Sequence, residues 1–136
     1  LKFRNTSSRI IVVKVSPDSP DSDIIEICNI LAQIPTTAIN IGNSKYVRAD
    51  EVGLSSKSFS MDGGGLSGKN LYRNTLRLVK LVSSKYDIPI IATGGVSSYD
   101  NVRELLDNGA SLTGVATLLV TDPFQIPLIN HRLSSD

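Results

Sequence analysis

Cysteine is almost absent from this chain of 136 residues, which contains only Cys28. A single cysteine excludes an internal disulfide and argues against a metal site built on cysteine. Cys28 lies among isoleucines and leucine at helical spacing, so we expect a buried structural thiol on a helix. The one histidine, His131, lies beside Arg132 near the C-terminus, and we expect it at the surface, with no metal or catalytic role.

Long apolar runs and concentrated charge are also missing. No run of 18 or more apolar residues occurs, so the sequence predicts no membrane span. Residues 1–5 lack both an initiator Met and the apolar stretch of a secretory signal, as expected of a processed or excised piece. The formal net charge is +1 with scattered Lys and Arg, which predicts no nucleic-acid partner.

The composition suits one domain of ordinary size, residues 1–136, because 40% of the residues are hydrophobic. Four short apolar runs have the length and composition of strands. They cover residues 10–15, 37–41, 88–92 and 111–116. The runs are almost continuously apolar, which is typical of parallel strands that are buried on both faces.

Helical patterns follow the first two runs. Ser19, Pro20 and Asp21 offer a cap, a proline suited to the first helical position and an acid in the first turn. Pro35 then stops this helix. After the second run we expect a long polar loop over residues 42–69. The helix beyond it has an apolar stripe formed by Leu71, Leu78, Val79, Val82 and Tyr86.

Two more helices follow the last two runs. Ser97 or Ser98 is expected to cap the first of them, and Gly109 stands where a glycine commonly ends a helix. Asp122 and Pro123 open the last one. The order β-α-β-loop-α-β-α-β-α predicts right-handed βαβ units and a parallel sheet. An open doubly wound sheet and a fragment of a barrel both satisfy this pattern.

Two polar residues end apolar runs. Alternation puts Val12 and Lys14 on one face of the first strand. A lone strand lysine commonly extends to the rim, but ligand sites of parallel α/β folds lie at the carboxyl ends of strands, which favours a site role for Lys14. Asn40 closes the second run with donors and acceptors. Capping a turn with Gly42 is its equally good alternative.

Glycines gather in two further segments. Residues 63–69 read G-G-G-L-S-G-K, and their N–H groups could cradle an anion, with a flexible linker as the alternative. The segment is not a P-loop, because Asn70 stands where Ser or Thr is required. Gly94 and Gly95 lie between a strand and a capped helix, a position that suits a phosphate. Thr117 ends the next strand, in the adjacent βα loop.

In this order and spacing, the segments resemble the dihydroorotate dehydrogenase family, most closely its quinone-linked class. The resemblance covers residues 10–129 and rests on V-K-x-x-P-D, G-G-L-S-G-K, I-I-x-x-G-G-V-S-S and G-A-S-L. It implies an α/β fold, namely the C-terminal half of a TIM (β/α)₈ barrel with four parallel β/α units. It also implies FMN and the oxidation of dihydroorotate to orotate in pyrimidine biosynthesis. A mitochondrial location is implied by the eukaryotic members of that class, with the cytoplasm as the alternative.

The resemblance assigns roles by position. Lys14 would lie beside the flavin ring and stabilise its anionic reduced form, and Asn40 would hydrogen-bond the orotate ring. Five positions would contact FMN, the first two through a loop and the last three at its phosphate: Ser67, Gly68, Gly94, Gly95 and Thr117. No metal site is implied.

The sequence also departs from the family pattern. Ile41 stands where the family usually has Thr, so we expect a hydroxyl to be missing from the substrate site. Ala116 replaces an aromatic residue near the phosphate, and residues 44–61 match poorly. The family's general base, a Ser or Cys on a loop of the N-terminal half, has no counterpart, since Cys28 is expected on a helix.

A complete barrel of this type needs about 250 residues, and four strands alone leave two open edges. We therefore expect a homo-oligomer or a partner chain that completes the barrel, and we expect this chain to be inactive alone. The first alternative is a degenerate, non-catalytic half that serves as a binding or structural subunit of a larger assembly. The second is a flavodoxin-like open sheet that binds another phosphate ligand.

Overall fold

Four parallel strands form the main sheet of the computed structural model, which describes residues 9–55 and 61–135. The strands lie in the order β1-β2-β5-β6, and each neighbouring pair is parallel. Their bounds are Ile11–Val15 for β1, Thr37–Ile41 for β2, Ile90–Thr93 for β5 and Leu112–Gly114 for β6. The alternation of strand and helix patterns in the sequence predicted this parallel sheet, which is thereby confirmed.

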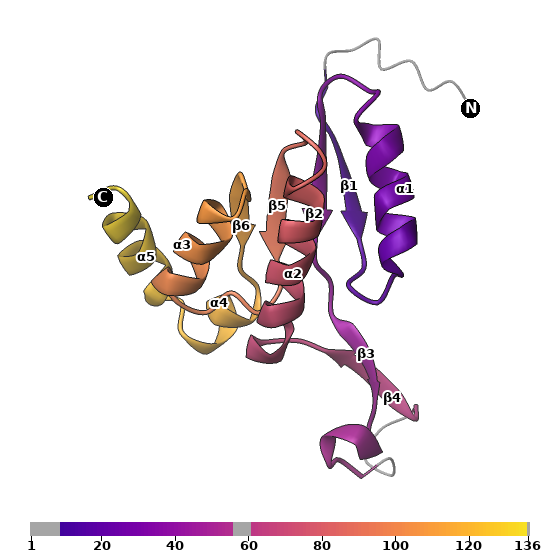
Figure 1. Ribbon diagram of the computed structural model, residues 1–136. Helices are drawn as coiled ribbons and strands as arrows, with labels where there is room; N and C mark the ends of the chain where they lie inside the picture. The colour runs from indigo at the N-terminus through magenta and orange to yellow at the C-terminus, as the bar shows by residue number, and fades with distance from the viewer. Residues whose placement is uncertain (1–8, 56–60, 136) are drawn as a thin grey trace.

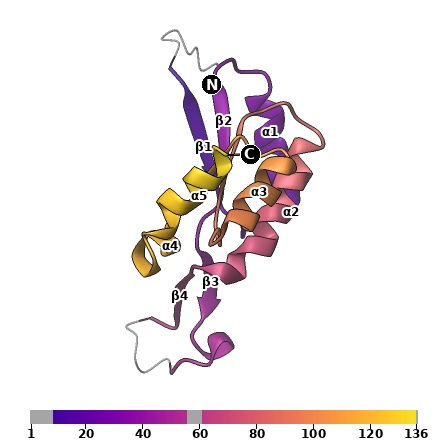
Figure 2. The same ribbon diagram turned by 90° about the vertical axis from the view of Figure 1, so that its left-hand side faces the viewer.

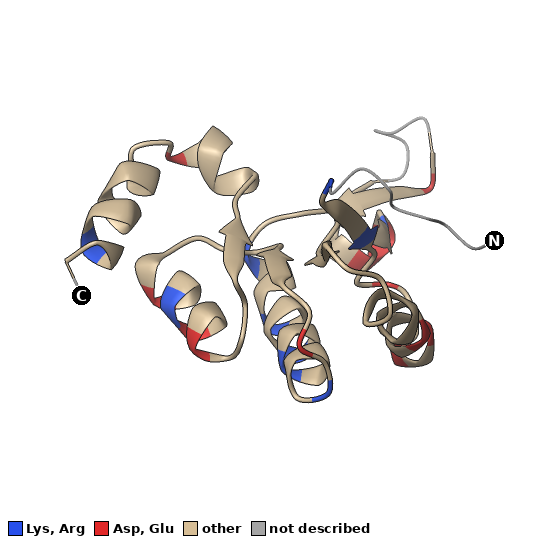
Figure 3. Cartoon of the chain, turned by 90° about the horizontal axis from the view of Figure 1, so that it is seen from above, with Lys and Arg blue, Asp and Glu red and all other residues tan. Residues whose placement is uncertain are grey.

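Three helices connect the strands and cover one face of the sheet, and two more follow the last strand. Their bounds are Asp21–Leu31 for α1, Tyr72–Ser83 for α2, Tyr99–Asp107 for α3, Thr117–Thr121 for α4 and Gln125–Leu133 for α5. Figures 1 and 2 show α1, α2 and α3 side by side along the strands, with α4 and α5 beyond β6. Seen from above, basic residues mark α2 and acidic residues mark α1 (Figure 3). The α4 helix had no counterpart in the expected order.

The core lies mainly between the sheet and helices α1, α2 and α3. Burying a large aliphatic side chain contributes about 1.5–3 kcal/mol, and the largest fully buried ones are Ile24, Ile39, Ile41, Leu78, Ile90 and Leu105. Cys28 on α1 is fully buried, and burial raises the pKa of its thiol. His131 lies exposed on α5. The positions predicted for Cys28 and His131 are therefore confirmed.

The face of the sheet opposite these helices is partly open. β2, in the interior of the sheet, is buried as predicted at all its residues except Asn40, which is partly buried. On the outer strands the prediction of two buried faces is wrong, because the side chains of Val12 and Leu112 are 47% and 61% exposed. The strand register puts both on the face that carries Lys14 and Asn40. Helices cover only the other face of β1 and β6.

The helix ends follow the sequence in part. Ser98 caps α3 by accepting a hydrogen bond from the N–H of Asn101, and Gly109 follows α3 with φ 101°, both as predicted. At α1 the predicted side-chain cap is wrong. The helix begins at Asp21, Pro20 stands at the N-cap position rather than at the first helical position, and no side chain caps the helix.

The predicted polar loop over residues 42–69 is wrong, because its described part contains an antiparallel hairpin. β3 (Lys45–Arg48) pairs with β4 (Gly63–Leu66), and the short helices η1 (Asp50–Val52) and η3 (Lys69–Leu71) flank β4. Three consecutive glycines carry little strand propensity, so the pattern hid β4. A Cβ on Gly63 would lie 2.3 Å from the carbonyl oxygen of Val47, so the glycine permits this pairing.

Candidate functional site

A pocket of about 820 Å³ lies where the carboxyl ends of the main strands meet the loops that follow them. Ligands of parallel α/β folds bind at this edge of the sheet. The fold brings six of the seven predicted site residues to the lining, although they are far apart in the sequence. These are Lys14, Ser67, Gly68, Gly94, Gly95 and Thr117.

Lys14 reaches the pocket from β1. Its register partner on β2 is Asn40, so both side chains leave the sheet on the face opposite α1, α2 and α3. The Nζ of Lys14 donates a hydrogen bond to Oδ1 of Asn43, over 3.2 Å. Its charged end therefore lies within the pocket lining, where the position at the end of the strand predicted it.

Asn40 is the one predicted site residue outside the lining. Its side-chain oxygen is buried and accepts no hydrogen bond within residues 9–55 and 61–135. A buried acceptor without a donor costs about 1–3 kcal/mol, so a donor brought to this position would be favourable. Lys14, on the neighbouring strand, is directed to Asn43 instead.

The two departures from the family pattern lie in different places. Ile41 is fully buried among the core side chains between the sheet and the helices, and it does not line the pocket. The expectation that Ile41 removes a hydroxyl from the site is therefore wrong, because alternation directs Ile41 away from the Asn40 face. Ala116 does line the pocket, just before α4.

The loop after β5 passes very close to α2. Gly94 and Gly95 have φ of 131° and 75°, a region that favours glycine. A Cβ on Gly94 would lie 2.8 Å from Oγ1 of Thr75, and one on Gly95 would lie 2.3 Å from the backbone nitrogen of Tyr72. Only glycine at these positions lets the loop lie against the start of α2.

Gly68 and Thr117 come together across the pocket. Gly68 has φ 98° just before η3, and a Cβ there would contact the methyl carbon of Thr117 at 3.7 Å. Thr117 is the first residue of α4. Its predicted position at the end of a strand is wrong, because β6 already ends at Gly114. Ser67, beside Gly68, is exposed.

Several other residues that line the pocket were not predicted as site residues, among them Asn43, Thr93 and Gln125. Alternation along β5 could have identified Thr93, which shares the Lys14 face. Asn43 looked like a turn residue, and its contact with Lys14 depends on how β1 and β2 pair. Gln125 had no local signal, because it reaches the pocket only through the path of α5.

The charged residues of the lining are two lysines and one aspartate, namely Lys14, Lys69 and Asp122. Basic side chains and glycine-rich backbone at the carboxyl edge of a parallel sheet suit an anionic ligand. Within the described ranges, no helix is long and apolar enough to cross a membrane. In the same part of the chain, no three His, Cys, Asp or Glu side chains form a cluster that could hold a metal ion.

Comparison with known proteins identifies the family of this chain. The family model described as dihydroorotate dehydrogenase matches residues 2–136. The chain belongs to the dihydroorotate dehydrogenase family. Dihydroorotate dehydrogenase (quinone), mitochondrial, of Schizosaccharomyces pombe is 33% identical over 129 residues, which are 93% of this chain and 28% of that protein.

Two bacterial dihydroorotate dehydrogenases show that the likeness extends across the family. The quinone enzyme of Actinobacillus pleuropneumoniae is 31% identical over 91% of this chain and 36% of its own length. Dihydroorotate dehydrogenase B (NAD(+)), catalytic subunit, of Halalkalibacterium halodurans is 29% identical over 97% of this chain and 43% of its own length. The chain thus spans between about a quarter and a half of these relatives.

A crystal structure of DHODH from Eimeria tenella, in complex with ferulenol, superposes with a TM-score of 0.77 and 23% identity. The match covers 91% of this chain and 33% of that one. The parallel sheet with alternating helices is therefore part of an α/β barrel, as the family resemblance implied.

Proposed function

We propose that this chain supplies the FMN-phosphate half of a dihydroorotate dehydrogenase that oxidises dihydroorotate to orotate. The observation that carries the proposal is the convergence of six residues, assigned to FMN by resemblance, on one pocket. They come from four separate segments, namely β1, the link between β4 and η3, the loop after β5 and the start of α4. Family membership supports the reaction class.

The residues fit the cofactor that this family generally uses. Gly94 and Gly95 let the loop after β5 lie against Thr75 and Tyr72, and this loop, like Gly68, presents its backbone to the pocket. Lys14 and Lys69 supply positive charge for a phosphate or an anionic ring. FMN, when bound, supplies the electron acceptor for the oxidation. The chain's own part would be to hold the phosphate and to place a positive charge at the ring.

The Asn40 amide would serve the substrate. Its side-chain oxygen is buried without a donor, whereas the dihydroorotate ring carries N–H groups that can donate. Pairing the two would relieve the cost of the lone acceptor. Asn40 is thus proposed to contact the substrate ring from the face of the sheet that also carries Lys14.

The barrel would be completed by further protein. β1 and β6 each pair on one side only in the described part of the chain, and unpaired strand edges attract other strands. The exposed Val12 and Leu112 share the open face of the sheet. We therefore propose that residues 1–136 form a single half-barrel unit, covered by the complementary β/α half or by a second copy.

A general base is not proposed for this chain. The cysteine, Cys28, is fully buried on α1 and outside the pocket lining. The second candidate function is a non-catalytic half that acts as a binding or structural subunit, and the observation that favours it is Ala116, which lines the pocket where the family usually has an aromatic residue. The two candidates differ in whether the completed barrel oxidises dihydroorotate.

Flavin binding tests the proposal first. Titration of FMN with the purified chain, followed by flavin absorbance and fluorescence, should show saturable binding. Lys14→Ala should weaken it by roughly tenfold, since it removes a charge at the pocket. Lys45→Ala is the control, because Lys45 is exposed on β3 and outside the lining. Equal binding by all three proteins, or none by any, counts against the proposal.

Activity separates the two candidates. The chain is mixed with N-terminal halves of quinone-linked relatives, and dihydroorotate oxidation and the mass in solution are measured. Activity in a mixed complex supports the dehydrogenase. A stable complex that binds FMN and has no activity supports the structural subunit. Leu112→Lys, on the open face, should weaken the complex while the chain stays folded.

The cell compartment is a separate proposal. Likeness to the S. pombe enzyme, whose name includes the mitochondrion, supports a mitochondrial location. Likeness to bacterial enzymes supports the cytoplasm as the alternative. Fractionation of cells that express the tagged full-length protein distinguishes the two.

A further inference from the structure

Asn101, in the first turn of α3, hydrogen-bonds Ser97 and Ser98 in the loop that follows β5. Its Oδ1 accepts hydrogen bonds from the backbone N–H of Ser97 over 3.2 Å and from the Ser97 hydroxyl over 3.1 Å. The backbone N–H of Asn101 donates to Oγ of Ser98 over 3.2 Å. Asn101 does not line the pocket, whereas Ser97 does. One side chain outside the pocket thus fixes a residue that faces it.

This contact changes which groups the loop offers to an anion. Both donors of Ser97 are directed toward Asn101 and away from the pocket. A phosphate in the pocket would therefore rely on the backbone around Gly94 and Gly95 rather than on Ser97. The position of that backbone depends in turn on the segment that Asn101 holds.

Tyr72, the first residue of α2, contacts the same loop. Its backbone nitrogen lies 2.3 Å from the position that a Cβ on Gly95 would take. Its hydroxyl donates to the Glu104 carboxylate over 2.6 Å and lies 3.2 Å from the carbonyl oxygen of Asn101. The loop after β5 is therefore enclosed between α2 and α3, with Asn101 bonded to both Ser97 and Tyr72.

We propose that Asn101 is a positioning residue for the phosphate site and sets the shape of residues 94–98 through Ser97 and Ser98. The inference rests on the proposed function, because it assumes that an anion binds this loop. An amide oxygen accepts the two Ser97 bonds without adding charge. A carboxylate at position 101 would accept the same bonds, but its negative charge would repel a phosphate.

The test is a titration of the chain with inorganic phosphate, followed by the amide NMR signals of Gly94 and Gly95, with FMN as a second probe. Asn101→Ala should weaken phosphate binding by roughly tenfold, since it releases Ser97. Asn101→Asp keeps the acceptor, so its loss should be large at low salt and shrink as salt is added. The loss in Asn101→Ala, which comes from the released Ser97 and from no change in charge, should by contrast stay the same relative to the unchanged chain as salt is added.

Asn108→Ala is the matched control. Asn108 lies at the other end of α3, where its side-chain amide donates to the backbone oxygen of Glu104 over 2.7 Å. This variant loses a comparable bond and should bind phosphate as the unchanged chain does. Unchanged affinity in both Asn101 variants, or an equal loss in Asn108→Ala, overturns the inference. An unchanged chain that binds neither phosphate nor FMN overturns the proposed function itself.

Discussion

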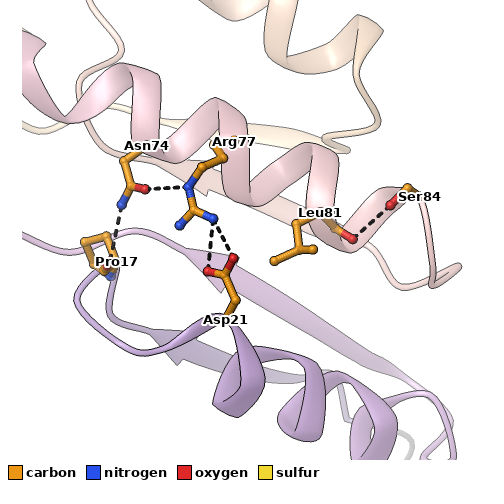
Figure 4. A network of polar contacts seen from close by, with 6 residues as sticks. All are labelled: Pro17, Asp21, Asn74, Arg77, Leu81 and Ser84. Carbon is orange, nitrogen blue, oxygen red and sulfur yellow. Dashed lines mark hydrogen bonds and ion pairs between the residues drawn. The ribbon is translucent and has the colours of Figure 1, made fainter.

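The guanidinium group of Arg77 on α2 contacts both carboxylate oxygens of Asp21 on α1, at 2.7 and 3.0 Å (Figure 4). The Nε of Arg77 also donates to Oδ1 of Asn74 over 3.0 Å. The Asn74 amide donates in turn to the carbonyl oxygen of Pro17 over 3.2 Å. This network ties α2 to the loop that follows the strand of Lys14.

Removal of this ion pair should have a small but measurable effect on stability. Both side chains are about half exposed, at 49% and 51%, and such pairs contribute about 0.2–1 kcal/mol. We expect a coupling energy in that range from a double-mutant cycle of Arg77→Ala and Asp21→Ala, measured by urea unfolding. Lys80→Ala, on the same helix, is the control. Additive effects of the two substitutions would show that the contact contributes nothing.

The glycine loop should be far less tolerant than the glycine hairpin. Gly95→Ala places a Cβ 2.3 Å from the Tyr72 nitrogen at φ 75°, so we expect more than about 1 kcal/mol of lost stability. Gly64→Ala meets no atom within 4 Å and should change stability little. Thermal unfolding of both variants, followed by circular dichroism, checks the difference. Similar midpoints for the two would contradict the close approach.

The sequence predicted the strands and helices of the main sheet well, since their patterns are local. Thr37–Ile41 is a strand over the predicted residues, and the Ser98 cap follows from its own side chain. The hairpin strand Gly63–Leu66 was missed because its glycines form a strand only where β3 lies alongside. Local patterns carry no information about such a neighbour.

The candidate site was predictable where it depends on backbone. Gly94, which has a positive φ, lies in a pair of glycines between a strand and a helix, and such a pair indicates a close approach of backbone from the sequence alone. Side-chain partnerships were not predictable, because they depend on register between distant elements. The Lys14–Asn43 contact and the burial of Ile41 on the helix side both depend on how β1 and β2 pair.

Alkaline pH should weaken the bridge between α2 and α3. Burial, then the hydrogen bond and charge of Glu104, raise the pKa of Tyr72 above its ordinary value of 10.0. Stability from a raised pKa is fully present below the ordinary value and is lost as pH rises through the folded-state value. Tyr72→Phe should therefore flatten the fall in unfolding free energy above about pH 10.

The matched variant for this effect is Glu104→Gln, which keeps the partner but removes its negative charge. It should flatten the same alkaline fall only in part, because burial of the ring remains the larger cause. Urea unfolding at a series of pH values measures both variants against the unchanged chain. Parallel curves for all three proteins would show that Tyr72 does not link stability to pH.

Replacing Asn40 with leucine should raise the stability of the chain and weaken substrate binding. Its buried oxygen has no donor in the described part of the chain, so Asn40→Leu, of similar shape, removes an unpaired polar group. We expect the chain to gain about 1 kcal/mol of unfolding free energy. Asn43→Leu, at an exposed residue bonded to Lys14, should bring no gain in unfolding free energy.

In the completed barrel, Asn40→Leu should weaken orotate binding, as measured by calorimetry, while FMN affinity stays the same. Lost stability, or unaltered orotate binding, would rule out the role proposed for Asn40.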